Sequence, residues 1–486
     1  MLFNSIDFLI FFPIVTLLYF VLPYTYRWLL LLVASCWFYM AFIPYYILIL
    51  GFTIVVDYFA GIYIERTKDP RFKKSLLVAS IIANIGTLVF FKYFNFLNEN
   101  VSDLLRVFNV QNPVSFLNIV LPIGLSFHTF QALSYTIEVY RGKQPAEKHF
   151  GLYSLYVLFY PQLVAGPIER PQHVLPQFRI NNDFNVAKAS SGLRLMAWGF
   201  FKKLVIADRV SVAVNSVYNT PENHGSVALI IATFFFAIQI YCDFSGYTDI
   251  ARGAARVMGY ELIQNFKSPY LSSSVTEFWQ RWHISLSTWF RDYLYIPLGG
   301  NRVSIPRWYV NLLIVFLVSG LWHGANWTFI VWGALHGIVI IIEATVKRFS
   351  KNQTTHQKSH AIIRAIKTVF TFILVSLIWI FFRANTIDDA IYILRNIFSW
   401  NQLSTFEFTV KNISKSVGLV KSEFFIGLYA IALLLLFENL NERFNMVKRL
   451  LKQPIVIRMG VYTMLILIII IFGNYTGLQQ FIYFQF

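Results

Sequence analysis

The sequence predicts an all-α protein that crosses a membrane many times as a helical bundle, with re-entrant and interfacial helices among the spans. Hydrophobic residues make up 57% of its 486 residues and charged residues only 13%, whereas soluble domains contain about 25% charged residues. Apolar runs long enough to cross about 30 Å of hydrocarbon recur along the whole chain. Because the bilayer core offers the backbone no hydrogen-bond partners, these runs are expected to be helices.

We predict twelve spans, and one shorter apolar run that does not cross. The spans lie near residues 6–22, 28–42, 45–63, 76–94, 116–139, 193–214, 227–247, 308–321, 328–344, 369–382, 424–437 and 461–472. The run at 152–164 is short and rich in proline and glycine toward its end, so we expect it to be re-entrant or interfacial. The first run has no basic segment before it and no cleavage site, which predicts a retained span. No repeat or separate soluble part is visible, so one membrane domain over residues 1–486 is expected.

The charges between the runs predict an orientation. Basic clusters are expected to face the cytoplasm; they lie at residues 66–74, 141–148, 170–179, 202–209, 302–307, 347–367 and 443–458. The connections at 95–112, 218–224 and 386–423 should face outward, and the last of these has room for an amphipathic helix. This places the N terminus outside and residues 282–307 on the cytoplasmic side. The net charge of +17 then reflects orientation and contact with anionic membrane lipids, and we expect no nucleic-acid partner.

Two histidines lie where an ionisable side chain is costly. His283 lies in an aromatic-rich amphipathic segment, and His323 ends an apolar run. Gly324 and Asn326 follow His323 and can break the helix, which places this histidine partway across the membrane at the tip of a hairpin. The simplest alternative is a neutral histidine that packs two helices. Two histidines and a helix break within one stretch favour a functional site.

The motifs that are absent narrow the chemistry. The chain has no P-loop, nucleophile elbow, H-E-x-x-H or C-x-x-C. We expect no metal site, because His356 and His360, four residues apart, lie in a polar loop. Acyl transfer from a thioester to a hydroxyl needs no covalent enzyme intermediate, but it needs a base for the hydroxyl proton. A neutral imidazole suits this task, and burial keeps it neutral.

Other polar residues on or beside the predicted spans, Asn326 among them, are weaker candidates for lining a cavity or assisting the site. His128 and Gln131 follow helical spacing, as if lining a cavity, although hydrogen bonding between helices explains them more simply. Asp243 belongs to a polar stripe with Ser245, Asp249 and Arg252, which suggests either a buried Asp–Arg pair or a carboxylate that orients a histidine. His336, on the span after His323, is expected to serve helix packing rather than an auxiliary role.

Several segments together carry a family resemblance. They are PIGLSFHTFQ, FYPQLVAGPIER, GFFKKLVIAD, QIYCDFSGYTDIARG, FWQRWHISLSTWFRDYLYIPLGGNR, LWHGANWTFIVWGALHG, WIFFRA and FIYFQF. The chain resembles the membrane-bound O-acyltransferases, in particular the bacterial branch of the alginate O-acetyltransferase membrane subunit. The resemblance implies that His323, in W-H-G, is the essential histidine and that His283, in R-W-H, is the second. The sister branch of teichoic-acid D-alanyl transferases shares both motifs, but the continuation after W-H-G is closer to the polysaccharide branch.

The resemblance also implies a reaction and a location. Acetyl-CoA or another acyl-CoA would be the cytoplasmic donor, with no bound cofactor, at the bacterial cytoplasmic (inner) membrane. The acceptor would be an exported polysaccharide, usually reached through a partner acetyltransferase outside. We expect His323 to act as general base or to position the acceptor, and His283 to orient the thioester at the cytoplasmic entrance. Asn301, Arg302 and Arg307 could hold the CoA diphosphate.

Three alternatives remain open at this point. Broken helices and intramembrane polar residues are also typical of transporters and flippases. A non-catalytic membrane scaffold for an exported acetyltransferase would need neither histidine as a base. Within the same enzyme class, the chain could transfer D-alanine or a longer acyl chain to a lipid or protein.

Overall fold

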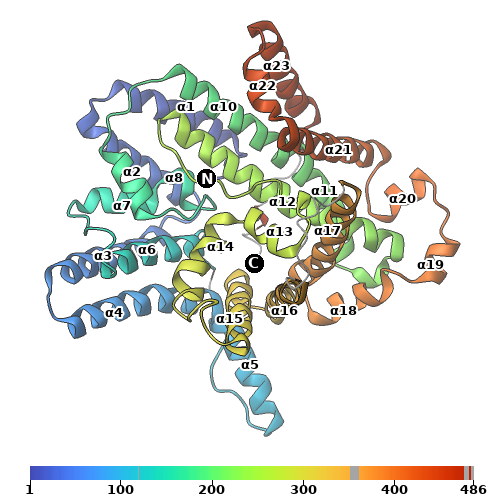
Figure 1. Ribbon diagram of the computed structural model, residues 1–486, viewed down its shortest axis with the longest axis horizontal. Helices are drawn as coiled ribbons and strands as arrows, with labels where there is room; N and C mark the ends of the chain where they lie inside the picture. The colour runs from blue at the N-terminus through green and yellow to red at the C-terminus, as the bar shows by residue number, and fades with distance from the viewer. Residues whose placement is uncertain (119, 351–360, 476–480, 483–486) are drawn as a thin grey trace. The chain divides into compact units, whose positions relative to one another are not determined.

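The computed structural model describes residues 1–118, 120–350, 361–475 and 481–482, and all regular secondary structure in these ranges is helical (Figure 1). This confirms the predicted all-α class. The contacts divide the chain into two compact units, Met1–Met196 with Tyr247–Ile263, and Ala197–Gly246 with Gln264–Phe486. The expectation of one membrane domain over residues 1–486 stays a prediction. His356 and His360 lie outside the described residues.

The first unit contains the amino-terminal helices. They are α1 (Ile6–Val21), α2 (Tyr24–Met40), α3 (Tyr46–Arg66), α4 (Pro70–Leu88), the π-helical turn η1 (Val89–Tyr93), α5 (Phe94–Val107), α6 (Leu125–Tyr140), α7 (Phe150–Leu158), α8 (Tyr160–Leu163), α9 (Pro171–Val174), the 3₁₀ turn η2 (Leu175–Arg179) and most of α10 (Val186–Phe200). The last turns of α12 (Ser226–Val257) also belong to it.

Helices α3 and α4 are joined by a buried polar network that the apolar pattern of the sequence did not reveal. Asp57 on α3 accepts hydrogen bonds from Ser80 Oγ at 2.5 Å and from Asn84 Nδ2 at 2.8 and 3.0 Å, both on α4. All three residues are fully buried. Buried polar groups need such partners, so this network fixes how the two helices meet.

The span predicted at residues 116–139 was wrong at its start, because α6 begins only at Leu125. Pro122 has no backbone N–H to donate, and Gly124 adopts a left-handed conformation with φ of 77°. The carbonyl of Pro122 instead accepts a bond from the N–H of Leu125 in a tight turn. The helix therefore starts after this proline–glycine turn.

The short run predicted to be re-entrant folds as two short buried helices. α7 has nine residues and α8 has four. At 1.5 Å per residue α7 is about 14 Å long, too short to cross about 30 Å of hydrocarbon. Residues 152–164 are buried throughout, which satisfies the requirement that broken backbone inside a membrane be covered by protein.

The second unit holds the two histidine motifs. Its elements are η3 (Phe201–Ala207), α11 (Asp208–Tyr218), η4 (Pro221–Asn223), the first part of α12, η5 (Pro269–Leu271), α13 (Val275–Arg281), α14 (Ile284–Phe290), η6 (Arg291–Tyr295), α15 (Ile305–His323), α16 (Trp327–Ser350), α17 (Ala361–Arg383), α18 (Ile387–Asn396), α19 (Trp400–Thr405), α20 (Val410–Ser416), α21 (Lys421–Phe444), α22 (Met446–Leu451) and α23 (Ile455–Phe472). The helix expected in the connection at 386–423 is α18, which begins with a capping box between Thr386 and Asp389.

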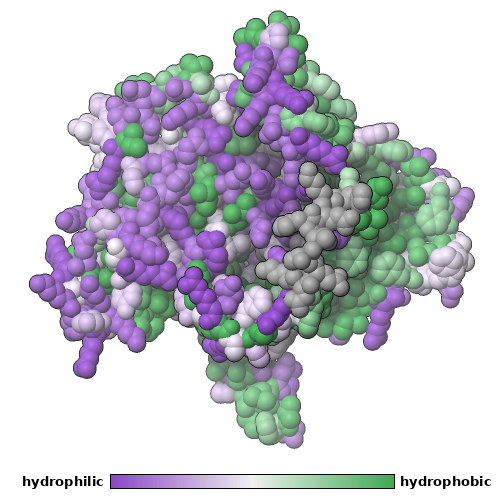
Figure 2. Space-filling model, in the orientation of Figure 1, coloured by the Kyte–Doolittle hydropathy of each residue, from purple (hydrophilic) through white to green (hydrophobic). Residues whose placement is uncertain are grey.

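Among the described residues, eight helices are long and apolar enough to cross a membrane, so the protein is a multi-pass membrane protein. Other predicted spans fall on helices below that length, such as α1 with 16 residues and α2 with 17. Apolar surface gathers over α5 in Figure 2, where Leu97, Leu104 and Val107 are at least half exposed. Lipid chains can cover such a surface, whereas its exposure to water would be unfavourable.

Candidate functional site

The predicted helix break after His323 is present. α15 ends at His323 and α16 begins at Trp327, and the two helices pack along each other as a hairpin (Figure 1). Gly324 lies so close to Phe329 that an added Cβ would be 2.0 Å from its ring. Asn326, a weak cavity candidate, instead accepts a bond from the Thr328 N–H at 3.0 Å and donates to the Asn385 carbonyl at 3.1 Å. Asn326 therefore shapes the turn that ends at α16.

Aromatic rings hold His323 at the tip of this hairpin. Its ring meets Trp332 edge-on at 5.1 Å and Phe382 at 5.3 Å between centroids. The residue is 6% exposed, whereas His336 is fully buried. Trp332 stacks on Trp379, with ring centroids 5.5 Å apart. His323 therefore lies at the edge of a rigid aromatic group in which rotation of the imidazole is restricted.

We call Trp279, Trp282, Trp332 and Trp379 the tryptophan cluster. Ring contacts of 5.2–5.8 Å connect its members across α13, α16 and α17. His336 packs against this cluster at 5.0 Å from Trp332, and the indole N–H of Trp279 donates to its Nδ1 at 3.3 Å. The proton of a neutral His336 therefore resides on Nε2. This arrangement supports the expected packing role of His336.

His283 lies in the same unit on the other side of Trp282. It is 1% exposed, and the rings of Phe244 and Phe266 contact it at 4.7 and 6.4 Å. Phe266 also touches Trp282, which contacts Trp379. A continuous row of packed rings thus joins the two histidines. Burial lowers the pKa of His283 to about 3, so its imidazole is neutral near pH 7.

Asp243 pairs with a lysine rather than with a histidine or an arginine. Lys203 Nζ lies 2.8 Å from Asp243 and 2.7 Å from Asp208, and all three residues are buried. The second oxygen of Asp243 accepts the backbone N–H of Ile482 at 2.8 Å. The basic cluster at 202–209, expected to mark the cytoplasmic side, therefore includes two buried lysines. The apolar residues around these lysines in the segment GFFKKLVIAD were the only sign in the sequence that the lysines would be buried.

The residues proposed for the donor phosphates lie in the turn before α15 and in the first turn of that helix. Asn301, Arg302 and Arg307 are all exposed. Asn311 fixes the turn by donating to the carbonyls of residues 298 and 300, each at 3.1 Å. Sixteen residues of α15 separate Arg307 from His323, a helical rise of about 24 Å. A ligand that reaches both places would have to be long and extended.

His128 and Gln131 lie in the first unit and face a small pocket. His128 Nε2 is hydrogen-bonded to Thr53 Oγ1 on α3, and Gln131 Oε1 accepts the backbone N–H of Glu169 at 2.9 Å. Both residues line the pocket together with Gln162 and the backbone near Gly166. The structure thus supports hydrogen bonding between elements, with a cavity beside it. It does not bring these residues into the unit that holds His283 and His323.

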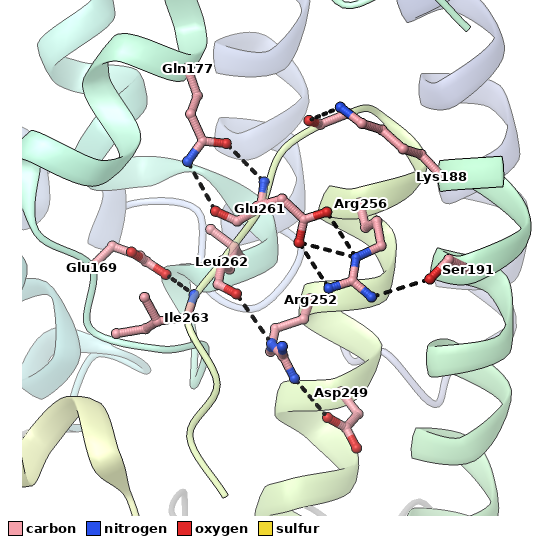
Figure 3. Close-up of polar contacts among 11 residues, drawn as sticks. Glu169, Gln177, Lys188, Ser191, Asp249, Arg252, Arg256, Glu261, Leu262 and Ile263 are labelled. Atoms are coloured by element: carbon pink, nitrogen blue, oxygen red, sulfur yellow. Dashed lines mark hydrogen bonds and ion pairs between the residues drawn. The ribbon is translucent and has the colours of Figure 1, made fainter. Parts of the chain in front are cut away.

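Polar contacts in the first unit pin the segment that follows α12 (Figure 3). Gln177 bonds both backbone groups of Glu261 at 2.8 and 3.0 Å, and Glu169 accepts the N–H of Ile263 at 2.6 Å. Arg256 forms an ion pair with Glu261 at 2.8 Å. Arg252 donates to the Leu262 carbonyl and lies 3.5 Å from Asp249. The Asp–Arg pair expected within the polar stripe is therefore the pair of Asp249 and Arg252, whereas Asp243 pairs with Lys203.

Known proteins are similar to most of this chain. The membrane-bound O-acyltransferase family model matches residues 147–383. A protein named probable alginate O-acetylase from Azotobacter vinelandii is 37% identical over 421 residues, 86% of this chain and 81% of the relative. The peptidoglycan O-acetyltransferase of Helicobacter pylori is 33% identical over 403 residues, 78% of this chain and 74% of the relative. The teichoic acid D-alanyltransferase of Bacillus subtilis is 26% identical over 251 residues, 48% of this chain and 62% of the relative.

Proposed function

The chain belongs to the membrane-bound O-acyltransferase family, and from that premise we propose that it moves an acetyl group from cytoplasmic acetyl-CoA toward hydroxyls of an exported polysaccharide. A partner acetyltransferase on the outer side of the bacterial cytoplasmic (inner) membrane receives the group. Both steps are transfers between existing esters, thioesters and hydroxyls, so no bound cofactor takes part.

In the proposed reaction His323 is the general base. The acceptor oxygen attacks the thioester carbonyl while the neutral imidazole takes the hydroxyl proton, and the carbon–sulfur bond then breaks. The imidazolium returns the proton to the leaving thiolate, so the enzyme ends unchanged. The observation that carries this proposal is the position of His323 at the helix break, slightly exposed and fixed by Trp332 and Phe382. His283 would orient the thioester.

The names of the relatives support the transferred group and the acceptor class. Two of them are named for O-acetylation of alginate and of peptidoglycan, and they match 78–86% of this chain. The D-alanyltransferase matches only 48% of it at lower identity. This difference favours acetyl over D-alanyl transfer. Because both O-acetylation names specify a glycan, alginate or peptidoglycan, we propose a glycan hydroxyl as the final acceptor.

The test is transfer of label from [¹⁴C]acetyl-CoA in membranes that contain the full-length chain. We expect wild-type membranes to label an envelope polymer or an extracytoplasmic protein. His323→Ala should lower the initial rate by at least roughly a hundredfold, the lower range for loss of a general base. His224→Ala is the matched control, because the ring nitrogens of His224 contact only the carbonyls of Ser216 and Ser416, near the ends of α11 and α20; it should keep the wild-type rate.

Two outcomes would contradict the proposal. If correctly inserted His323→Ala transferred label at the wild-type rate, His323 would not be the general base, and the result would favour a non-catalytic scaffold. Uptake of acetyl-CoA without loss of its acetyl group would favour a transporter.

A further inference from the structure

The segment that enters the second unit after α12 is bonded to the backbone on both sides of His283. The N–H of Lys267 donates to the carbonyl of Arg281 at 2.9 Å. The N–H of Ile284 donates to the carbonyl of Asn265 at 2.9 Å. The N–H of Ser285 donates to the side-chain oxygen of the same asparagine at 3.1 Å. Residues 265–267 therefore clamp residues 281–285 through three hydrogen bonds. Asn265 takes part in two of them, one through its carbonyl and one through its side-chain oxygen.

The clamp surrounds a strained residue. His283 has φ of 43° and ψ of 54°, in the left-handed region that side chains other than glycine rarely adopt. Such strain persists only where the surroundings enforce it, and it often accompanies function. The bonds at Ile284 and Ser285 enforce it directly, because they fix the two residues that follow. Asn265 and Ser285 are each 1% exposed, so water does not replace these bonds.

The side chain of Asn265 acts here only as an acceptor. Its oxygen takes the Ser285 N–H, whereas its buried amide nitrogen has no hydrogen-bond partner among the described residues. An aspartic acid of the same shape, which burial favours in its neutral form, would keep the acceptor oxygen at this position. Phe266, the next residue, stacks on the His283 ring at 16° and 6.4 Å. One short segment therefore sets both the backbone and the ring plane of His283.

We propose that Asn265 is a positioning residue that holds His283 in its left-handed conformation for acyl transfer. The proposal rests on the proposed function of the His283 and His323 site. Nothing reacts at Asn265 itself; its oxygen and carbonyl determine where the imidazole lies. Loss of the side-chain bond lets the 283–285 backbone relax and displaces the ring.

The test compares Asn265→Ala and Asn265→Asp in membranes containing the full chain, with [¹⁴C]acetyl-CoA as the probe. We expect Asn265→Ala to lower kcat roughly tenfold to a hundredfold, as a displaced catalytic group does, with little change in KM for acetyl-CoA. Asn265→Asp should restore most of the rate. In a His283→Ala background, Asn265→Ala should cause no further loss. Asn98→Ala is the control, since Asn98 is a buried asparagine bonded to loop backbone at Val114.

A second measurement, amide hydrogen exchange at residues 284–285, separates this proposal from the proposed function. Asn265→Ala should lose protection there, and Asn265→Asp should keep it. Unchanged protection in Asn265→Ala would overturn the clamp. An equal loss of kcat from Asn265→Ala with or without His283 would overturn the positioning role. If membranes with the wild-type chain transferred no label, the acyltransferase function would be refuted. The hydrogen-exchange result would still show whether Asn265 holds residues 284–285 in place.

Discussion

At the level of single side chains, His173 and Glu169 form a contact whose strength depends on pH. Nδ1 of His173 lies 2.7 Å from the Glu169 carboxylate. This hydrogen bond raises the pKa of His173 above its ordinary value of 6.5, against the opposing effect of burial. A raised folded-state pKa stabilises the fold fully below the unfolded pKa, and this stabilisation is lost as pH rises through the folded pKa.

We therefore predict that the wild-type protein exceeds His173→Gln in Tm most strongly below about pH 6.5. The difference should shrink as pH increases above that value. Thermal unfolding of the purified full chain in detergent, from about pH 5.5 to about pH 8.5, measures it. Because the imidazole is 41% exposed, solvent weakens the pair and the effect should be small. A Tm difference that stays constant across this range would show that the charge of His173 contributes nothing.

Single residues also show what the sequence could and could not predict about the site. His283 and His323 stood out because each is an ionisable residue in an apolar setting, and the structure links them by packed rings. The partner of Asp243 could not be read from the sequence. Lys203 lies 40 positions away on another element, and helical spacing along α12 pointed only to neighbours on the same helix. Asn265 carried no signal, because its role depends on the backbone angles of His283.

At the scale of helices, the α15–α16 hairpin depends on close backbone approach. A Cβ added at Gly333 would lie 2.2 Å from the carbonyl oxygen of Phe316. Backbone cannot yield as a flexible side chain can, so the two helices must move apart. We predict that Gly333→Ala destabilises the protein by about 1–3 kcal/mol, more than the roughly 1 kcal/mol that alanine contributes to helix propensity. It should also lower the transfer rate, because His323 lies at the tip of this hairpin.

The matched control is Gly86→Ala on α4, where an added Cβ would meet nothing within 4 Å. This variant should be neutral or slightly stabilised. Denaturant unfolding in detergent micelles provides the comparison. If Gly333→Ala proved as stable as Gly86→Ala, close approach would not hold the hairpin together.

The positions of the helices were more predictable than their ends. Long apolar runs located α3 and α15 to within three residues at each end, and α16, α17, α21 and α23 to within eight. The start of α6 was misplaced because apolar residues continue through the Pro122–Gly124 turn. α12 continues to Val257, ten residues beyond the predicted end, and the partly exposed pair Asp249 and Arg252 lies in this extension. The apolar pattern thus predicts where the middle of a helix lies. The ends depend on proline and glycine residues and on pairs of polar side chains, which the pattern does not contain.

At the scale of the whole molecule, the proposed reaction needs the donor and the acceptor on opposite sides of the membrane. Four helices lie between the exposed turn at Asn301 and the exposed Ser404 on α19, and of these α15, α16 and α17 are long and apolar enough to cross a membrane. If each of the three crosses, as their lengths of 19 to 24 residues allow, the two positions face opposite sides. The basic residues at 302–307 assign the cytoplasm to Asn301.

We therefore predict that Asn301→Cys reacts with a membrane-impermeant maleimide only after the membrane is opened, whereas Ser404→Cys reacts in intact spheroplasts. Cys36 and Cys242 would be replaced by alanine in both variants to remove background labelling. Reaction of both cysteines from the same side would mean that an even number of these helices crosses. That result would place the exposed turn at Asn301 and the connection that contains Ser404 on the same side of the membrane, and it would contradict the arrangement in which a cytoplasmic thioester and an outer hydroxyl approach the site from opposite sides.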